Sequence, residues 1–228
     1  MKLKSDLRPF IAVIFLLLSF CSKAQDKRKF VPGSYVTQKG DTIKGYIFMP
    51  PDNYIPRDNA FGTFNFKNQF EDISISVISY DSCRLISSGG ESFSVWRIQR
   101  NMTYVDKFDF TIRNIDSNIT APIPLKLLYK GVQFSLYHYH DVKDHFFIYD
   151  GKTMQELLIQ FRYLTAWEQI PCGSQTPQHY VIPVYHQQIM WMMNNQLTKR
   201  QQDFIESTDY ETRPLVKLFK YLDHNKEK

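Results

Sequence analysis

With 228 residues, of which 43% are hydrophobic, the chain is long enough for one domain with a sizeable core. Its 28 Lys and Arg against 23 Asp and Glu give a formal net charge of +5. Four of these basic residues and one acidic residue lie in residues 1–24, so the rest carries only +2, which gives no reason to expect nucleic acid or an anionic membrane as a partner.

Residues 1–24 have the pattern of a secretory signal peptide. Basic residues precede an apolar stretch over 9–20, and Ser22 and Ala24 put small residues at the −3 and −1 positions of a cut before Gln25. A transmembrane anchor is the alternative, but the apolar stretch is about a dozen residues and a span needs about 20. We therefore expect a periplasmic or extracellular protein without an integral membrane span after cleavage.

Lipid attachment at Cys21 is a second alternative for the same segment and would make an outer-membrane lipoprotein. Phe20 is bulky where lipoprotein processing needs a small residue, which argues against it.

A β-hairpin is predicted over residues 34–48, because two runs of β-branched and aromatic residues flank Gly40-Asp41. Its register stays open: a two-residue turn places Tyr35 opposite Tyr46, and a three-residue turn places it opposite Gly45. Gly45 itself indicates a close approach of a neighbouring strand.

Further antiparallel strands are predicted wherever short alternating runs are bounded by Gly, Asn, Asp or Ser. These runs cover residues 62–66, 73–80, 83–86, 92–98, 104–112, 125–130, 132–140, 145–149 and 153–159. Val132, Phe134 and Leu136 would share the core face of one strand. The proline-containing segments 50–59 and 114–124 are predicted to be loops.

Periodicity becomes helical toward the C-terminus. After an irregular stretch at 161–180, Tyr185, Ile189, Met192/Met193 and Leu197 follow a helical spacing. A last helix begins with a capping box at Thr208 and Glu211 or with a cap at Thr212 and Pro214 in the first turn. The expected fold is α+β: an antiparallel β-rich domain of successive hairpins over 25–161, and a linker with two or three packed helices over 162–228.

The hairpin sequence GSYVTQKGDTIKGYI at 33–47, the later LYKGVQFSLY at 128–137 and the helical C-terminus carry a resemblance. The chain resembles a group of uncharacterised exported β-rich proteins of Bacteroidota-type Gram-negative bacteria. The resemblance implies export and a β-rich fold, and it implies no activity, cofactor or catalytic residue.

Three histidines in the second predicted hairpin are the best chemical candidates. His138 and His140 are two apart on one strand and point the same way, and His145 follows the expected turn Asp141–Asp144. Together they could bind a metal such as zinc. A polar, aromatic hairpin tip without a ligand explains the same residues.

Cys83 and Cys172 remain after cleavage, and a pair of cysteines in an exported protein suggests a disulfide. Closing a loop of about 90 residues would contribute roughly 4–5 kcal/mol in the chain-entropy model. Two buried thiols are the alternative.

Aromatic side chains are numerous enough to form a sugar or peptide groove, although sheet cores use the same residues. The candidates are Trp96, Tyr104, Tyr129, Tyr137, Tyr139, Tyr149, Trp167 and Trp191. The cluster Met190–Met193 is either a partner-binding groove or the buried face of a helix.

Catalysis has little support in the sequence. Asp106, Asp109, Asp116 and Glu156 are not paired by spacing, and nucleophile-elbow, phosphate-loop and zinc-protease motifs are absent. We expect a non-catalytic cell-envelope protein without a cofactor, whose partner is another envelope protein or a glycan. The alternatives are an envelope or polysaccharide-directed hydrolase, and a metal-binding protein using His138, His140 and His145.

Overall fold

The computed structural model describes residues 29–49, 62–164, 179–193 and 197–224. The chain divides into residues 1–30 and a compact unit from Val31 onward, and the description below concerns that unit. The predicted signal peptide and Cys21 lie outside the described residues.

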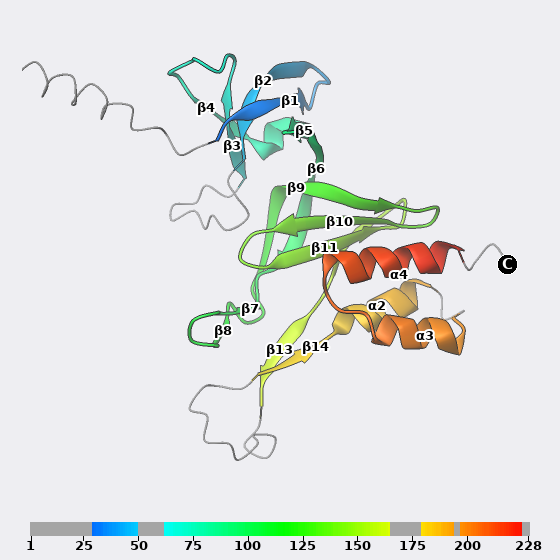
Figure 1. Ribbon diagram of the computed structural model, residues 1–228. Coiled ribbons are helices and arrows are strands. Elements are labelled where there is room, and N and C mark those ends of the chain that lie inside the picture. Colours follow the sequence, from blue (N-terminus) through cyan, green and yellow to red (C-terminus); the bar gives the residue numbers. More distant parts are fainter. Residues whose placement is uncertain (1–28, 50–61, 165–178, 194–196, 225–228) are drawn as a thin grey trace, which may run out of the picture. The chain divides into compact units, whose positions relative to one another are not determined.

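Ten strands form the main sheet, and every pair of neighbours in it is antiparallel (Figure 1). Their order is β12-β11-β10-β9-β6-β5-β1-β2-β3-β4. The strands are β1 (Val31–Thr37), β2 (Thr42–Phe48), β3 (Thr63–Lys67), β4 (Ser76–Ser79), β5 (Cys83–Ser88), β6 (Glu91–Asn101), β9 (Asn118–Lys130), β10 (Ser135–His140), β11 (Asp144–Tyr149) and β12 (Met154–Leu157). The predicted α+β class with an antiparallel body of hairpins is confirmed.

The first hairpin, β1–β2, has Gly40 at φ +100°, as its turn requires. Both predicted registers are wrong, because Tyr35 lies opposite Ile43. The close approach predicted at Gly45 is confirmed, since a Cβ there would collide with the Lys67 carbonyl oxygen and the Phe66 ring on β3.

The loop predicted over 114–124 is wrong from Asn118 onward, because these residues belong to β9 (Asn118–Lys130). Pro122 and Pro124 lie in the part of β9 that pairs with β6, whereas β10 pairs with β9 only from Lys126 onward. This part of β9 therefore has a ladder on one side only, where prolines that lack an N–H are tolerated.

Two small hairpins correct other predictions. The predicted strand 104–112 is a hairpin of β7 (Tyr104–Val105) and β8 (Ile112–Arg113), and Phe108 lies fully in solvent at its tip. Parts of the predicted irregular stretch 161–180 form β13 (Gln160–Tyr163) and β14 (His179–Ile182), which pair with each other. The prediction that Val132 is a core residue is also wrong, because its side chain is 90% exposed in the turn before β10.

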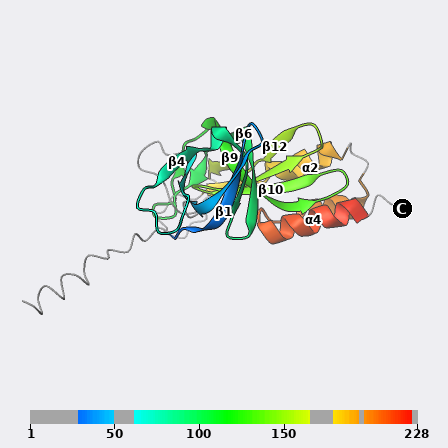
Figure 2. The same ribbon diagram turned by 90° about the horizontal axis from the view of Figure 1, so that it is seen from above.

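Three helices end the described chain: α2 (Val184–Met192), α3 (Lys199–Glu206) and α4 (Thr212–His224). The structure places a capping box at the start of α3, where Thr198 and Gln201 bond each other's backbone N–H, instead of at Thr208 and Glu211. Pro214 lies in the first turn of α4, as predicted. Figure 2 shows α4 alongside β10.

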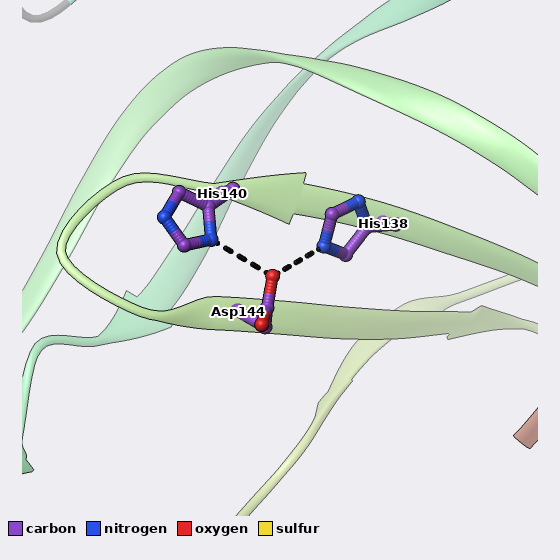
Figure 3. A group of neighbouring side chains, drawn as sticks. All are labelled: His138, His140 and Asp144. Atoms are coloured by element: carbon purple, nitrogen blue, oxygen red, sulfur yellow. Dashed lines mark hydrogen bonds and ion pairs between the residues drawn. The ribbon is translucent and has the colours of Figure 1, made fainter. Parts of the chain in front are cut away.

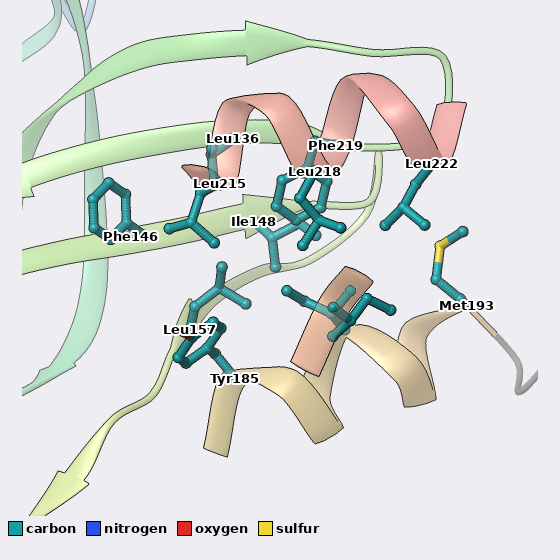
Figure 4. Close-up of a cluster of buried hydrophobic side chains, with 12 residues drawn as sticks. Leu136, Phe146, Ile148, Leu157, Tyr185, Met193, Leu215, Leu218, Phe219 and Leu222 are labelled. Atoms are coloured by element: carbon teal, nitrogen blue, oxygen red, sulfur yellow. The ribbon is translucent and has the colours of Figure 1, made fainter. Parts of the chain in front are cut away.

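The largest hydrophobic cluster lies between these helices and one face of β10–β12 (Figure 4). The strands contribute Leu136, Phe146, Ile148 and Leu157, and the helices contribute Tyr185, Ile189, Met193, Ile205, Leu215, Leu218, Phe219 and Leu222. A second cluster, centred on Tyr35, Ile47 and Phe64, lies at the other end of the sheet, and a third joins Ile98, Ile123, Leu125 and Phe147.

Across the described residues, no helix has the length and apolar character needed to cross a membrane.

Candidate functional site

The hairpin of β10 and β11 brings three potential metal ligands together on one face. His140 lies directly opposite Asp144, and His138 lies opposite Phe146 two pairs further along. Residues two apart on a strand and directly opposite across an antiparallel pair share a face. The side chains of His138, His140 and Asp144 therefore converge (Figure 3).

One oxygen of Asp144 accepts both imidazole hydrogen bonds. Asp144 Oδ1 lies 2.8 Å from His138 Nε2 and 2.8 Å from His140 Nδ1. These two hydrogen bonds hold the pKa of the Asp144 carboxyl well below its ordinary value. The Asp144 carboxylate is half-exposed and both histidines are partly buried, so solvent reaches the group from the side of Asp144.

The structure places His145 apart from the other two histidines. Its cross-strand partner is Tyr139, so its side chain projects to the opposite face of the sheet. It is completely buried there, and a metal site built from His138, His140 and His145 is excluded by this geometry. The third side chain that lies beside His138 and His140 is Asp144.

On that opposite face His145 belongs to a buried ionic network. Its Nε2 donates to Asp141 Oδ1 at 2.9 Å and its Nδ1 donates to Glu156 Oε1 at 2.6 Å. Arg100, from β6, donates from Nε to Asp141 Oδ2 at 2.9 Å, and the Asn101 backbone N–H donates to Glu156.

The network shifts the pKa values of His145 and Asp141 toward their charged forms. Burial alone would lower the pKa of His145, but hydrogen bonds to Asp141 and Glu156 outweigh it and raise the pKa above its ordinary value. Burial would likewise raise the pKa of Asp141, yet His145 and Arg100 lower it. Two cations and two anions thus compensate one another inside the protein.

The position of the network argues for a structural role. Asp141, His145 and Glu156 have side chains less than one-tenth exposed, so a substrate cannot reach them from solvent. Glu156 is one of the candidate carboxylates in the sequence, whereas Arg100 is not among the predicted site residues. Nothing in the sequence links these residues, because they come from β6, the β10–β11 turn and β12.

Two of the other three candidate carboxylates are also engaged in ion pairs. Asp106 and Asp109 both form ion pairs with Arg113, within the β7–β8 hairpin. Asp116 lies in the following turn at φ +55°. The structure does not bring any of them together with Glu156.

Trp191 forms an exposed aromatic surface on α2. Its side chain is 75% exposed, while Tyr185, Ile189 and Met193 bury the opposite side of the helix end. Trp191 borders two hollows, of about 620 and 480 Å³. The residues of the larger hollow are Val132, Gln133, Phe134, Asp150, Gln155, Trp191 and Met192, and those of the smaller one are Val184, Gln187, Gln188, Met190 and Trp191.

The other aromatic candidates do not gather at this surface. Tyr129 bonds Asp223 of α4, Trp96 packs against Tyr149 with ring centroids 5.4 Å apart, and Tyr139 stands over Arg100. Trp167 lies outside the described residues.

Cys83 is a fully buried thiol in the second hydrophobic cluster. Burial raises its pKa, against the effect of the Ser82 hydroxyl, so it lacks the properties of a nucleophile. Its predicted partner, Cys172, lies outside the described residues, and the disulfide stays a prediction.

Comparison with known protein families, with curated proteins and with solved structures gave no significant match.

Proposed function

We propose that the protein is an exported, non-catalytic component of the cell envelope that binds a glycan through the surface around Trp191. The export part rests on the pattern of residues 1–24 and on the resemblance to exported Bacteroidota-type proteins. The binding part rests on one observation: an exposed tryptophan between two hollows, bordered by exposed polar side chains.

The chemistry of this surface suits a sugar. An exposed indole offers a flat apolar face for the C–H groups of a pyranose ring. Gln133, Asp150 and Gln155 border the larger hollow, and amides and carboxylates supply the donors and acceptors that sugar hydroxyls need. The backbone N–H groups of Lys152 and Thr153 donate to Asp150, which holds its carboxylate in place.

The hydrolase alternative has weaker support. A glycosidase needs two carboxylates on either side of one accessible bond. Among the candidate carboxylates in the described residues, Glu156 is buried with His145, and Asp106 and Asp109 are paired with Arg113.

The test is to titrate the protein with envelope polysaccharides and their oligosaccharides while following tryptophan fluorescence and retention in affinity gels. We expect retention that Trp191→Ala abolishes. Phe108→Ala, which removes an even more exposed ring at the distant β7–β8 tip, is the matched control and should leave retention unchanged. Equal retention of both variants, or release of reducing sugar ends by the wild type, would refute the proposal.

Export is tested separately by fractionating the host cells and measuring the mass of the mature protein. Cleavage before Gln25 is expected. A full-length cytoplasmic product would refute this part of the proposal.

A further inference from the structure

We propose that His138, His140 and Asp144 bind one divalent transition-metal ion beside the turn of the β10–β11 hairpin. This site is independent of the Trp191 surface. Asp144 begins β11 and Asp150 follows its end, so the two sites are separated by six residues of extended strand, about 20 Å.

The three donor atoms already have nearly the spacing that a metal requires. His138 Nε2, His140 Nδ1 and one Asp144 oxygen all lie within 4.8 Å of one another, and each nitrogen is 2.8 Å from that oxygen. Ligands about 2.0–2.2 Å from a tetrahedral zinc ion are about 3.3–3.5 Å apart. Each nitrogen–oxygen distance would therefore have to lengthen by roughly 0.5–0.7 Å to admit an ion.

The backbone around the ligands is held from the opposite face of the sheet. Asp141, at the start of the hairpin turn, is fixed by Arg100 and His145, and its Oδ1 also accepts the Val142 N–H at 2.5 Å. This turn sets His140 opposite Asp144. The buried network thus pre-organises the metal ligands, which reduces the conformational entropy that binding would cost.

The His138 ring is also restrained. It packs against Phe146, its cross-strand neighbour, with ring centroids 5.0 Å apart. A ligand whose ring plane is already oriented loses less rotamer freedom when it coordinates a metal.

The donor set selects the class of ion. Two imidazoles and one carboxylate suit zinc, copper, nickel or iron(II), whereas calcium and magnesium prefer all-oxygen sites. Three protein ligands leave a further coordination position for water or an external ligand. The half-exposed Asp144 marks the solvent side, where that position would lie.

A group of two histidines bonded to one aspartate can also be a purely structural hydrogen-bond cluster. The two explanations differ in what a metal ion does to the protein. A hydrogen-bond cluster takes up no ion at stoichiometric concentration, and its melting temperature does not respond to zinc or to a chelator.

The experiment uses the untagged full-length protein, stripped with a chelator and titrated with zinc chloride by calorimetry. We expect one ion per chain and a zinc-dependent rise in melting temperature. Cobalt(II) in place of zinc should give the visible absorption bands of a tetrahedral site, which zinc should abolish by displacement.

Three variants locate the site: His138→Ala, His140→Ala and the nearly isosteric Asp144→Asn. Each should weaken zinc binding more than about 100-fold, because even the loss of an outer-shell partner costs about 10–100-fold. His224→Ala is the matched control, since this exposed histidine on α4 lies outside the cluster, and it should bind like the wild type. Melting in the presence of chelator shows that each variant is folded.

Two results would overturn the proposal. One is wild-type protein that binds no zinc, copper, nickel or iron(II) at stoichiometric concentration. The other is binding that survives in all three ligand variants, which would place the ion elsewhere. Tighter binding of iron(II) or copper than of zinc, with the same dependence on the variants, supports the site and identifies its preferred ion.

Discussion

His145 shows how a single buried residue ties three distant segments together. Both of its ring nitrogens face a carboxylate oxygen, so both carry a proton and the ring is an imidazolium. Asp141 and Glu156 compensate this charge, and Arg100 completes the set from β6. Arg100 Nη1 is the one buried side-chain polar atom of the described residues without a hydrogen-bond partner, so the network has little tolerance for further loss.

Replacing Asp141 with asparagine should therefore be strongly destabilising. The change removes the anion between Arg100 and His145 and leaves two buried cations with reduced compensation. We expect a loss of about 3–5 kcal/mol in the free energy of unfolding, measured by urea denaturation.

The exposed pair of Arg97 and Asp81 provides the control, since both side chains are more than half exposed. Asp81→Asn should cost less than about 1 kcal/mol. Similar losses in the two variants would show that burial does not make the Asp141 network important.

Two of the three residues of the candidate metal site were predictable from the sequence. The spacing of His138 and His140 correctly places both on one face. The prediction of His145 as the third member of the group is wrong, because it depends on a turn over Asp141–Asp144, which would put His145 opposite His140. The actual turn is one residue shorter, and a slip of one residue moves every side chain of the strand to the other face.

At the scale of elements, the contact between α4 and the β9–β10 turn is specific. Asp223 of α4 accepts hydrogen bonds from the Tyr129 hydroxyl at 2.7 Å and from the Val132 N–H at 3.3 Å. Gly131 lies between them, and a Cβ there would collide with the Asp223 carboxylate. Gly131, which separates the predicted strands 125–130 and 132–140, therefore also lies in the contact between α4 and the turn.

Tyr129→Phe should weaken this contact and change its pH dependence. The lost hydrogen bond to a charged group is worth about 1.5–3 kcal/mol. Burial, together with Asp223, raises the pKa of Tyr129 from 10.0 to about 12. A raised pKa means that the stabilisation is complete below pH 10 and is lost as the pH rises from 10 to 12.

The measurement is the free energy of unfolding of both proteins at pH 8 and across pH 10–12. The wild type should be more stable at pH 8, and the difference between the two should shrink as the pH rises. A difference that stays constant over this range would contradict the role of the Tyr129 proton.

Element types were predictable where periodicity was strong, and element boundaries were not. The first hairpin, β10–β11 and the C-terminal helices follow directly from alternating or helical spacing. Pro122 and Pro124 led to the prediction of a loop where β9 lies. Local sequence does not reveal that this part of the strand has a neighbour on only one side, where prolines are tolerated. The pairing of β13 with β14 depends on residues 16 or more apart and has no local signature.

At the scale of the molecule, one sheet connects two hydrophobic clusters that share no residue. The helices cover the cluster containing Leu136 and Leu218, and Tyr35, Phe64 and Tyr80 form the other. β6 links the two ends, because it pairs with β5 on one side and β9 on the other. The continuous ladder predicts that the two clusters unfold together, as in a two-state domain.

Leu218→Ala and Phe64→Ala test this cooperativity, one in each cluster. Both side chains are buried, so we expect losses of about 2–5 and 3–5 kcal/mol respectively. In native-state hydrogen exchange monitored by mass spectrometry, Leu218→Ala should lower protection in β1–β3 as well as in α4, because the slowest amides of both ends exchange through global unfolding. If Leu218→Ala affects only α2–α4 and β10–β12, while Phe64→Ala affects only β1–β5, the ladder through β6 does not couple the ends and the chain unfolds in two parts.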